Sequence, residues 1–138
     1  MKATPDQVWD VLADGWLYPL WVVGATRMRE VDDTWPAPGA KLHHSVGAWP
    51  AVLDDETVSL ECRPREQLSL QAKGWPIGEA RVDITLEPVA GGTRVVIEED
   101  ATHGPGRLVP KPARAPMIAW RNGETLRRLA YLAERREG

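Results

Sequence analysis

The start of the chain carries the pattern of an amphipathic helix. Thr4 is followed by Pro5 and, three residues after Thr4, by Gln7, which is the arrangement of a capping box with proline in the first turn. Apolar residues within 8–12 then share one face at spacings of three and four. The sequence therefore predicts a helix from about residue 4, with Gly15 ending it in a left-handed conformation.

The pattern changes after a short apolar segment at 16–21, which Pro19 interrupts and which predicts a second short helix or turn. From there the apolar period is two, and apparent turns, including Asp54-Asp55, separate the periodic segments. We predict strands at about 26–32, 41–53, 57–63, 66–73, 79–88 and 93–101. Residues 80–87 alternate most clearly, which is typical of an antiparallel sheet with one wet face.

The end of the chain predicts a loop and then a long helix. Residues 102–115 are rich in Gly and Pro and are either a binding lip or a disordered connection. Pro116 is expected to open a helix that runs to about Arg136. Its apolar face consists of Ile118, Asn122, Leu126, Leu129 and Ala133.

This order of elements predicts an α+β fold. A single antiparallel sheet with one wet face needs a cover on its other face, and the C-terminal helix is the large candidate. A curved sheet that grips one helix leaves a gap near one end, where small molecules bind.

Four parts of the sequence resemble a known family. They are the run ATPDQVWDVLAD (3–14), Gly39 with the strand KLHHSVGAWP (41–50), the hairpin 91–93, and Arg121-Asn122. This pattern is similar to that of the SRPBCC proteins, which are START-like and birch-pollen-allergen-like and include polyketide cyclase/dehydrase-like members. The resemblance implies one helix-grip domain over residues 1–138, in which a curved antiparallel sheet wraps around the C-terminal helix and encloses an apolar cavity.

The sequence departs from that family at its start. The family has a full strand before the first helix, whereas only Met1 to Ala3 precede the cap here. We therefore expect six to seven strands, because that first strand is either nearly absent or lies before the start of this chain. A missing edge strand would leave its neighbour unpaired, so both a monomer and a homodimer stay open.

Composition and charge narrow the class of protein. The 138 residues suit one globular domain, with 43% hydrophobic and 27% charged residues. The net charge of −3 argues against a nucleic-acid partner, although residues 107–138 hold eight Lys and Arg against three Glu. A single cysteine, Cys62, excludes an internal disulfide, and neither a membrane span nor a secretory signal is visible. We therefore expect a cytoplasmic protein.

Little catalytic chemistry is visible in the sequence. His43 and His44 are neighbours on a predicted strand and so point to opposite faces, which argues against a metal site. The sequence carries none of the common nucleotide-binding or nucleophile motifs, so we expect no cofactor. His44 and Glu99 are candidates for proton transfer if both face inward. The alternative is that they satisfy each other or a backbone group, or face water.

Two residues of the last helix and several tryptophans remain as binding candidates. Asn122 lies on the apolar helix face and needs a partner, either a ligand or a strand carbonyl, while Arg121 is expected to pair with an acid at the rim. Trp35, Trp49 and Trp75 lie in or beside loops and Trp120 near the start of the helix, which suits a cavity mouth or plain packing. The predicted ligand-binding residues are Leu42, His44, Trp49, Leu70, Trp75, Val82, Met117, Trp120 and Asn122.

Three functions are compatible with these features. The first is the binding or carriage of a small hydrophobic molecule, such as a lipid, polyketide or isoprenoid, in an internal cavity. The second is a polyketide cyclase or dehydratase that uses His44 and Glu99 without a metal. The third is a protein-interaction module, which the basic tail and the open sheet edge favour.

Overall fold

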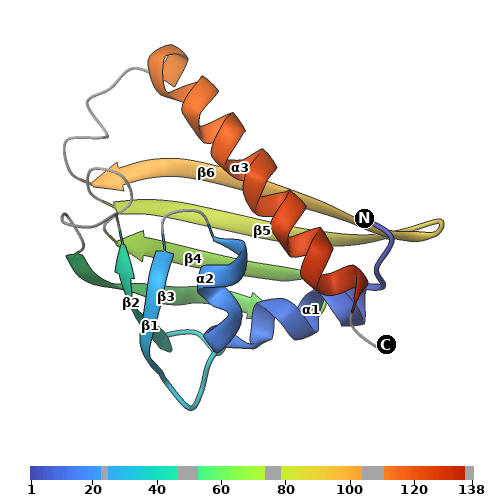
Figure 1. Ribbon diagram of the computed structural model, residues 1–138, viewed down its shortest axis with the longest axis horizontal. Coiled ribbons are helices and arrows are strands. Elements are labelled where there is room, and N and C mark those ends of the chain that lie inside the picture. Colours follow the sequence, from blue (N-terminus) through green and yellow to red (C-terminus); the bar gives the residue numbers. More distant parts are fainter. Residues whose placement is uncertain (23–24, 47–52, 74–78, 104–110, 136–138) are drawn as a thin grey trace.

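The computed structural model describes residues 1–22, 25–46, 53–73, 79–103 and 111–135 of the chain. The helices are α1 (Pro5–Ala13), the 3-10 turn η1 (Gly15–Leu17), α2 (Tyr18–Trp21) and α3 (Lys111–Glu134). The strands are β1 (Ala25–Val31), β2 (Lys41–Val46), β3 (Leu53–Arg63), β4 (Gln67–Lys73), β5 (Glu79–Val89) and β6 (Gly92–His103). The helices lie on one face of the sheet, and α3 crosses that face diagonally (Figure 1).

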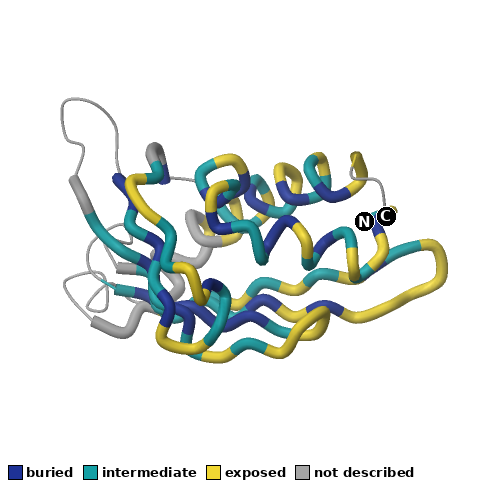
Figure 2. Tube along the Cα trace, turned by 90° about the horizontal axis from the view of Figure 1, so that it is seen from below, coloured by how far each residue is buried: buried dark blue, intermediate teal, exposed yellow. Residues whose placement is uncertain are grey.

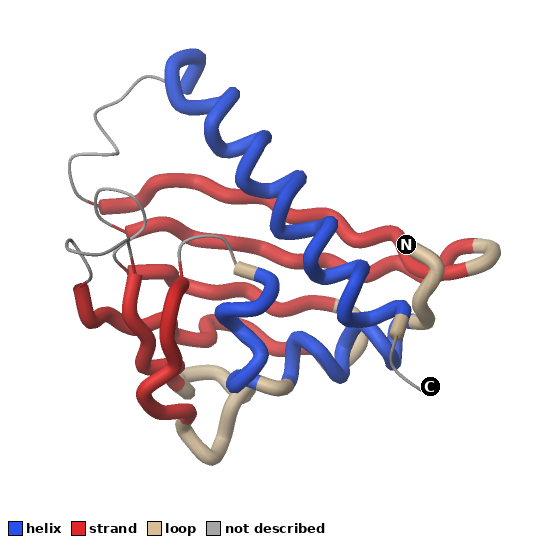
Figure 3. The backbone as a smooth tube through the Cα atoms, in the orientation of Figure 1, coloured by secondary structure: helices blue, strands red, loops and turns tan. Residues whose placement is uncertain are grey.

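The six strands form one sheet in sequence order, with each strand antiparallel to the next. This confirms the α+β helix-grip fold: Figure 2 shows the helices as a layer over the curved sheet, and Figure 3 shows the same division by secondary structure. The core lies between the layers and contains apolar residues of α1, α2, α3 and the inner sheet face. Burial of one face of each element stabilises this arrangement.

The first helix begins as its sequence predicts. The Thr4 hydroxyl accepts a hydrogen bond from the backbone N–H of Gln7 at 3.2 Å, and the Gln7 side chain accepts one from Thr4 N–H at 2.8 Å. The expectation for Gly15 was wrong, because α1 ends at Asp14 in an extended conformation and Gly15 begins η1. Space favours glycine there, since a Cβ atom would force the ends of the Leu42 and Val31 side chains to shift.

The predicted boundary between the second and third strands was also wrong. Asp54 and Asp55 are not a turn: they lie in β3, where they pair with Ser45 and His44 of β2. Local polar contacts accommodate Asp55 in a strand, because its carboxylate accepts from the Glu56 N–H at 2.8 Å and its carbonyl accepts from Arg29 at 3.0 Å. The segment between the two strands lies outside the described residues.

The C-terminal helix begins earlier than predicted. It starts at Lys111, so Pro116 lies inside the helix rather than at its first position. Proline there removes one backbone hydrogen bond, which a helix end near solvent tolerates better than a helix centre does. The predicted loop 102–115 was wrong at both ends, because β6 runs to His103 and α3 begins at Lys111; residues 104–110 lie outside the described part of the chain. None of the described helices is both long and apolar enough to span a membrane.

The first three residues lie along the start of β6. The amino group of Met1 donates to the Thr93 carbonyl at 2.8 Å, and the Thr93 N–H donates to the Met1 carbonyl at 3.0 Å. The Thr93 hydroxyl also donates to the Ala3 carbonyl at 2.7 Å. These contacts cover the beginning of β6 without a further strand among the described residues.

Candidate ligand-binding site

Five of the predicted site residues share the inner face of the sheet. Strand register places Leu70 of β4 beside Val82 of β5, and Val82 beside Glu99 of β6. Leu42 and His44 lie on the same face of β2 and are fully buried or nearly so. Their period-two spacing explains this common orientation, because alternate strand residues point to the same side. Leu42 and Leu70 also belong to the apolar core.

Three polar side chains from α2, β2 and β3 are joined by hydrogen bonds inside the protein. The Thr57 Oγ1 atom lies 2.8 Å from His44 Nε2 and 3.1 Å from the Tyr18 hydroxyl. The centroid of the Tyr18 ring lies 5.3 Å from that of the His44 ring and 5.3 Å from that of the Trp21 ring. All four side chains are buried, so this contact brings polar groups together away from solvent.

Burial keeps the two titratable members of this group uncharged near neutral pH. Burial is the main cause that lowers the pKa of His44, while the Ser45 backbone and the Asp55 carboxylate act more weakly in the opposite direction. Burial also raises the pKa of Tyr18, against a weaker lowering effect of its hydrogen bond to Thr57. His44 is therefore a neutral imidazole, and Tyr18 is a neutral phenol.

Two buried nitrogen atoms of this group have unused hydrogen-bonding capacity. Trp21 Nε1 and His44 Nδ1 find no partner of hydrogen-bond geometry among the described residues, although each side chain is only 2% exposed; the Ser45 backbone acts on the His44 ring without meeting that geometry. Trp21 Nε1 can only donate, whereas His44 Nδ1 donates or accepts according to its tautomer. An unsatisfied buried polar group costs about 1–3 kcal/mol, so such atoms are uncommon without a functional reason.

An ion pair joins the last strand to the last helix on the same side of the protein. Arg121 Nη1 lies 3.5 Å from Glu99 Oε2, and the two side chains are 19% and 3% exposed. Glu99 therefore faces inward, which is the condition for its candidacy, and Arg121 pairs with an acid as expected, although that acid is buried rather than at the rim. The Arg121 charge lowers the pKa of the Tyr18 hydroxyl, and the Glu99 charge raises it. We call Tyr18, Trp21, His44, Thr57, Glu99 and Arg121 the inner polar cluster.

The remaining predicted residues are not brought into the inner polar cluster. Asn122 is half-buried on α3, one position beyond Arg121. Trp120 is 66% exposed, because Arg121, Thr125 and Leu129 occupy the inward face of the helix. A role for Trp120 or Asn122 in ligand binding stays a prediction. Trp49, Trp75 and the side chain of Met117 lie outside the described residues.

Sequence reasoning missed three members of the cluster: Tyr18, Trp21 and Thr57. The available signal was weak. Tyr18 and Trp21 are three residues apart in a short apolar helix, which places both on one face with their polar atoms carried inward. Thr57 is a single hydroxyl in a strand, and only the pairing of β2 with β3 brings it next to the inner face of β2.

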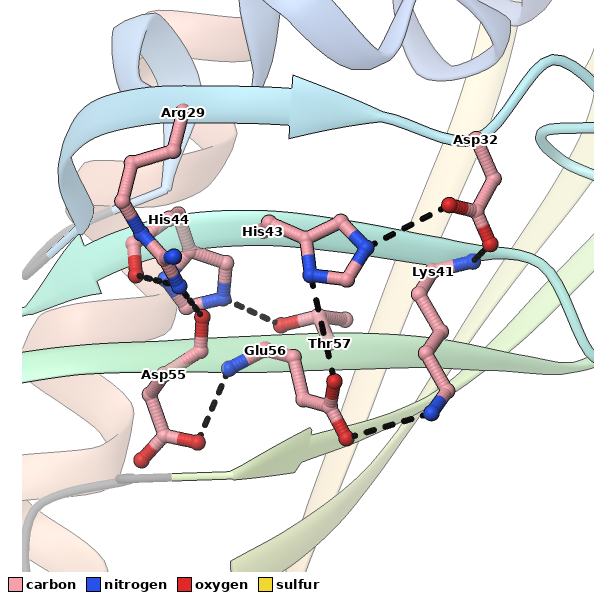
Figure 4. Close-up of polar contacts among 8 residues, drawn as sticks. All are labelled: Arg29, Asp32, Lys41, His43, His44, Asp55, Glu56 and Thr57. Carbon is pink, nitrogen blue, oxygen red and sulfur yellow. Dashed lines mark hydrogen bonds and ion pairs between the residues drawn. The ribbon is translucent and has the colours of Figure 1, made fainter.

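His43 points away from this cluster, as strand alternation predicts (Figure 4). On the outer face its ring lies 3.3 Å from Asp32 and 4.0 Å from Glu56, and Glu56 also lies 3.5 Å from Lys41. Among the described residues, no group of three or more His, Cys, Asp or Glu side chains is arranged to hold a metal ion. His43 thus belongs to a surface network of charged groups.

A separate groove of about 470 Å³ opens on the surface near the end of α1. Its described lining residues are Asp10, Ala13, Asp14, Gly15, Trp16, Val31, Asp32, Asp33 and Trp35. None of them belongs to the inner polar cluster. Trp35 is a buried core residue whose indole N–H donates to the Leu12 carbonyl at 3.3 Å, which accounts for its position.

The fold places the chain in the class of helix-grip proteins, and the sequence identifies its family. The chain belongs to the family described as polyketide cyclase / dehydrase and lipid transport, which it matches over residues 1–134. The SRPBCC resemblance is therefore confirmed. A comparison with curated proteins gives no match.

Solved structures show the same fold at low sequence identity. A protein from Nitrosomonas europaea is 18% identical with a TM-score of 0.73, over 99% of this chain and 91% of that one. Ara h 8.0201 is 12% identical with a TM-score of 0.70, over 96% and 92%. The di-domain ARO/CYC protein StfQ from the steffimycin biosynthetic pathway is 12% identical with a TM-score of 0.71, over 96% of this chain and 47% of that one.

Proposed function

We propose that this protein binds a small hydrophobic molecule between the inner face of the sheet and α3. The observation that carries the proposal is the pair of buried nitrogen atoms, Trp21 Nε1 and His44 Nδ1, which have no partner in the described part of the protein. A ligand with a polar group would satisfy them, and the apolar side chains of the inner face would bury the rest of its surface.

The position of α3 supports the same proposal. Its backbone approaches α1 and α2 most closely and, among the strands, β6. Leu129 and Ala133 of α3 share the buried core with Leu70, whereas the helix backbone stays farther from the central strands than from α1, α2 and β6. Membership of a family described by cyclase, dehydrase and lipid-transport functions also fits a small hydrophobic ligand.

Fluorescence titration with N-phenylnaphthylamine, a neutral hydrophobic probe, tests this function. We expect saturable binding of one probe per chain. Val82→Trp places a bulky side chain on the inner face of β5, where the ligand is proposed to lie, and should abolish binding. The matched control is Val96→Trp, because Val96 belongs to the adjacent strand β6 and is 39% exposed.

Circular dichroism and thermal unfolding establish that both variants are folded before binding is compared. Loss of binding in Val82→Trp with retention in Val96→Trp supports an inner site. Equal binding by the two variants, or the absence of saturable binding by the wild-type protein, would contradict it.

A second candidate function is a cyclase or dehydratase reaction, which one observation favours. His44 is buried and neutral, and the Thr57 hydroxyl links it to Tyr18, so a proton can pass along this chain of groups. In such a reaction His44 Nδ1 accepts a proton from a carbon atom next to a carbonyl group of the ligand. Glu99 is the second proton-handling candidate.

Native mass spectrometry separates this function from simple binding. The protein is exposed to a lipid and small-molecule extract of its source cells, and the mass of any bound compound is followed with time. A dehydratase, or a cyclase whose ring closure is followed by dehydration, converts the bound mass to one lighter by a water molecule, and His44→Gln retains the unconverted compound. A bound mass that never changes excludes dehydration of that compound; its chromatographic retention before and after incubation then separates cyclisation without loss of water from binding alone. Equal conversion by His44→Gln would remove His44 from the mechanism.

A further inference from the structure

The inner polar cluster offers hydrogen bonds that an uncharged ligand can complete. Trp21 Nε1 carries an N–H that can only donate, and His44, which carries the second unpartnered nitrogen, packs against the same Tyr18 ring as Trp21. A hydroxyl group both donates and accepts, and a carbonyl group accepts. Either group can form a hydrogen bond with at least one of the two buried nitrogen atoms. Such a bond is stronger in a buried site than in water.

The charges around the cluster are already balanced. The charged groups that act on His44 and Tyr18 are Arg29, Asp55, Glu99 and Arg121, together with His43 when it is protonated. Two of the four are cationic and two are anionic. Arg121 pairs with Glu99 at 3.5 Å, and Arg29 donates to the carbonyls of His44 and Asp55 at 3.5 and 3.0 Å.

An anionic ligand would therefore bring a charge that the described part of the site does not compensate. The charge of Arg121 already faces the Glu99 carboxylate, Arg29 donates to two backbone carbonyls, and the buried imidazole is neutral. Asp55 lies beside His44 in the register of β2 and β3, so its negative charge further opposes an anion. Burial of an uncompensated carboxylate costs several kcal/mol, far more than one hydrogen bond returns.

We propose that the site selects an uncharged hydrophobic molecule with a hydroxyl or carbonyl group over a carboxylate with the same skeleton. This inference rests on the proposed binding function and specifies its ligand class. Trp21 is the donor that recognises the oxygen atom of the ligand. Phenols, long-chain alcohols and neutral ketones belong to the favoured class, and free fatty acids do not.

Three compounds with one skeleton test this selectivity: naphthalene, β-naphthol and β-naphthoate. Their affinities are measured by calorimetric titration of the full chain at neutral pH. We expect β-naphthol to bind about tenfold more tightly than naphthalene, which corresponds to one net hydrogen bond. We expect β-naphthoate to bind more weakly than naphthalene.

Two variants locate the effect. Trp21→Phe keeps an aromatic ring but removes the indole N–H, so the affinity for β-naphthol should fall to that for naphthalene, while naphthalene itself binds as before. Trp16→Phe is the control, because Trp16 is 58% exposed and lines the outer groove. It should retain the preference for β-naphthol.

The outcomes separate this inference from the proposed function. Binding of β-naphthoate as tight as that of β-naphthol would overturn the selectivity while leaving a binding site in place. Absence of binding by all three compounds would overturn the proposed function and this inference with it. The comparison of ligands on the wild-type chain decides the selectivity even if Trp21→Phe does not fold.

Discussion

Glu99 and Arg121 join the last strand to the last helix through an ion pair of 3.5 Å. The carboxylate is 3% exposed, so it is held on the inner face of the sheet by a charge from the opposite layer. The pair links β6 to α3 beside the inner polar cluster. It also leaves that part of the protein without a net charge of its own, and the proposed ligand class depends on this balance.

Because of this ion pair, we expect the removal of both charged residues to destabilise the protein less than the removal of Arg121 alone. Arg121→Met leaves the Glu99 carboxylate buried beside one fewer cation, and we expect a loss of about 3 kcal/mol in the free energy of unfolding. Replacing both residues with methionine removes both charges, so the double variant should be more stable than Arg121→Met alone. Urea unfolding measures all of these proteins. A double variant less stable than Arg121→Met would contradict the buried, uncompensated charge of Glu99 as the cause of the loss.

Removal of the Thr57 hydroxyl should lower the free energy of unfolding, and serine at this position should largely prevent that loss. Thr57→Val keeps the shape of the side chain but leaves the Tyr18 hydroxyl and His44 Nε2 without their shared partner. We expect a loss of about 1–3 kcal/mol in the free energy of unfolding. Thr57→Ser retains the hydroxyl and should recover most of this loss. Similar stabilities for the valine and serine variants would mean that the methyl group, rather than the hydroxyl, matters there.

The lowered pKa of His44 predicts how stability changes in mild acid. Because the folded pKa lies below the ordinary value of 6.5, the unfolded chain takes up a proton first as the pH falls. The free energy of unfolding should therefore decrease from about pH 6.5 downward, until the folded pKa is reached, and be unaffected by this group at higher pH.

His44→Gln tests whether His44 causes this pH dependence. Glutamine can still form a hydrogen bond with Thr57 but has no charge to gain, so the decrease below pH 6.5 should be smaller than in the wild-type protein. Chemical unfolding at a series of pH values measures it. An unchanged slope between pH 6.5 and the range where carboxylates titrate would assign the pH dependence to another group.

Alanine should have opposite effects on the free energy of unfolding at two glycines in helical segments. Gly15→Ala places a Cβ atom against Leu42 and Val31, and we expect a loss of about 1–3 kcal/mol. Gly123→Ala in α3 meets no neighbour within 4 Å, and we expect a gain of up to about 1 kcal/mol from helix propensity. Thermal unfolding measures both. Destabilisation of equal size at the two positions would contradict the close contact at Gly15.

The sequence predicted the fold and the facing of strand side chains because both depend on local periodicity. Period two grouped His44 with Leu42 and Glu99 with Val95 and Ile97, but which side of the sheet faced inward stayed a condition until the helices were placed over it. The pairing of Arg121 with an acid was expected at the rim, whereas Glu99 is buried. The boundaries of strands and helices were predicted less well where a residue type is common in two kinds of local structure. Asp54-Asp55 is typical of turns but is tolerated in β3, and Pro116 is typical of a helix start but lies inside α3.

The inner polar cluster could not be predicted as a group, because its members come from five separate elements. Tyr18 and Trp21 look like core residues in an apolar segment, and their polar atoms gain meaning only when α2 is placed over β2 and β3. The bond from Thr57 to His44 depends on strand register, which a single sequence does not specify. Local pattern thus predicts orientation, whereas the site requires long-range pairing.

The central claim is that a ligand binds at the inner polar cluster, and the indole N–H of Trp21 reports this directly. Nuclear magnetic resonance follows all indole N–H signals during titration with β-naphthol, with Trp21→Phe and Trp16→Phe used to assign the two signals of interest. We predict a saturable change at Trp21, with a downfield shift as its N–H gains a hydrogen bond, and no change at Trp16. A change at Trp16 with none at Trp21 would place the ligand in the outer groove and contradict the account.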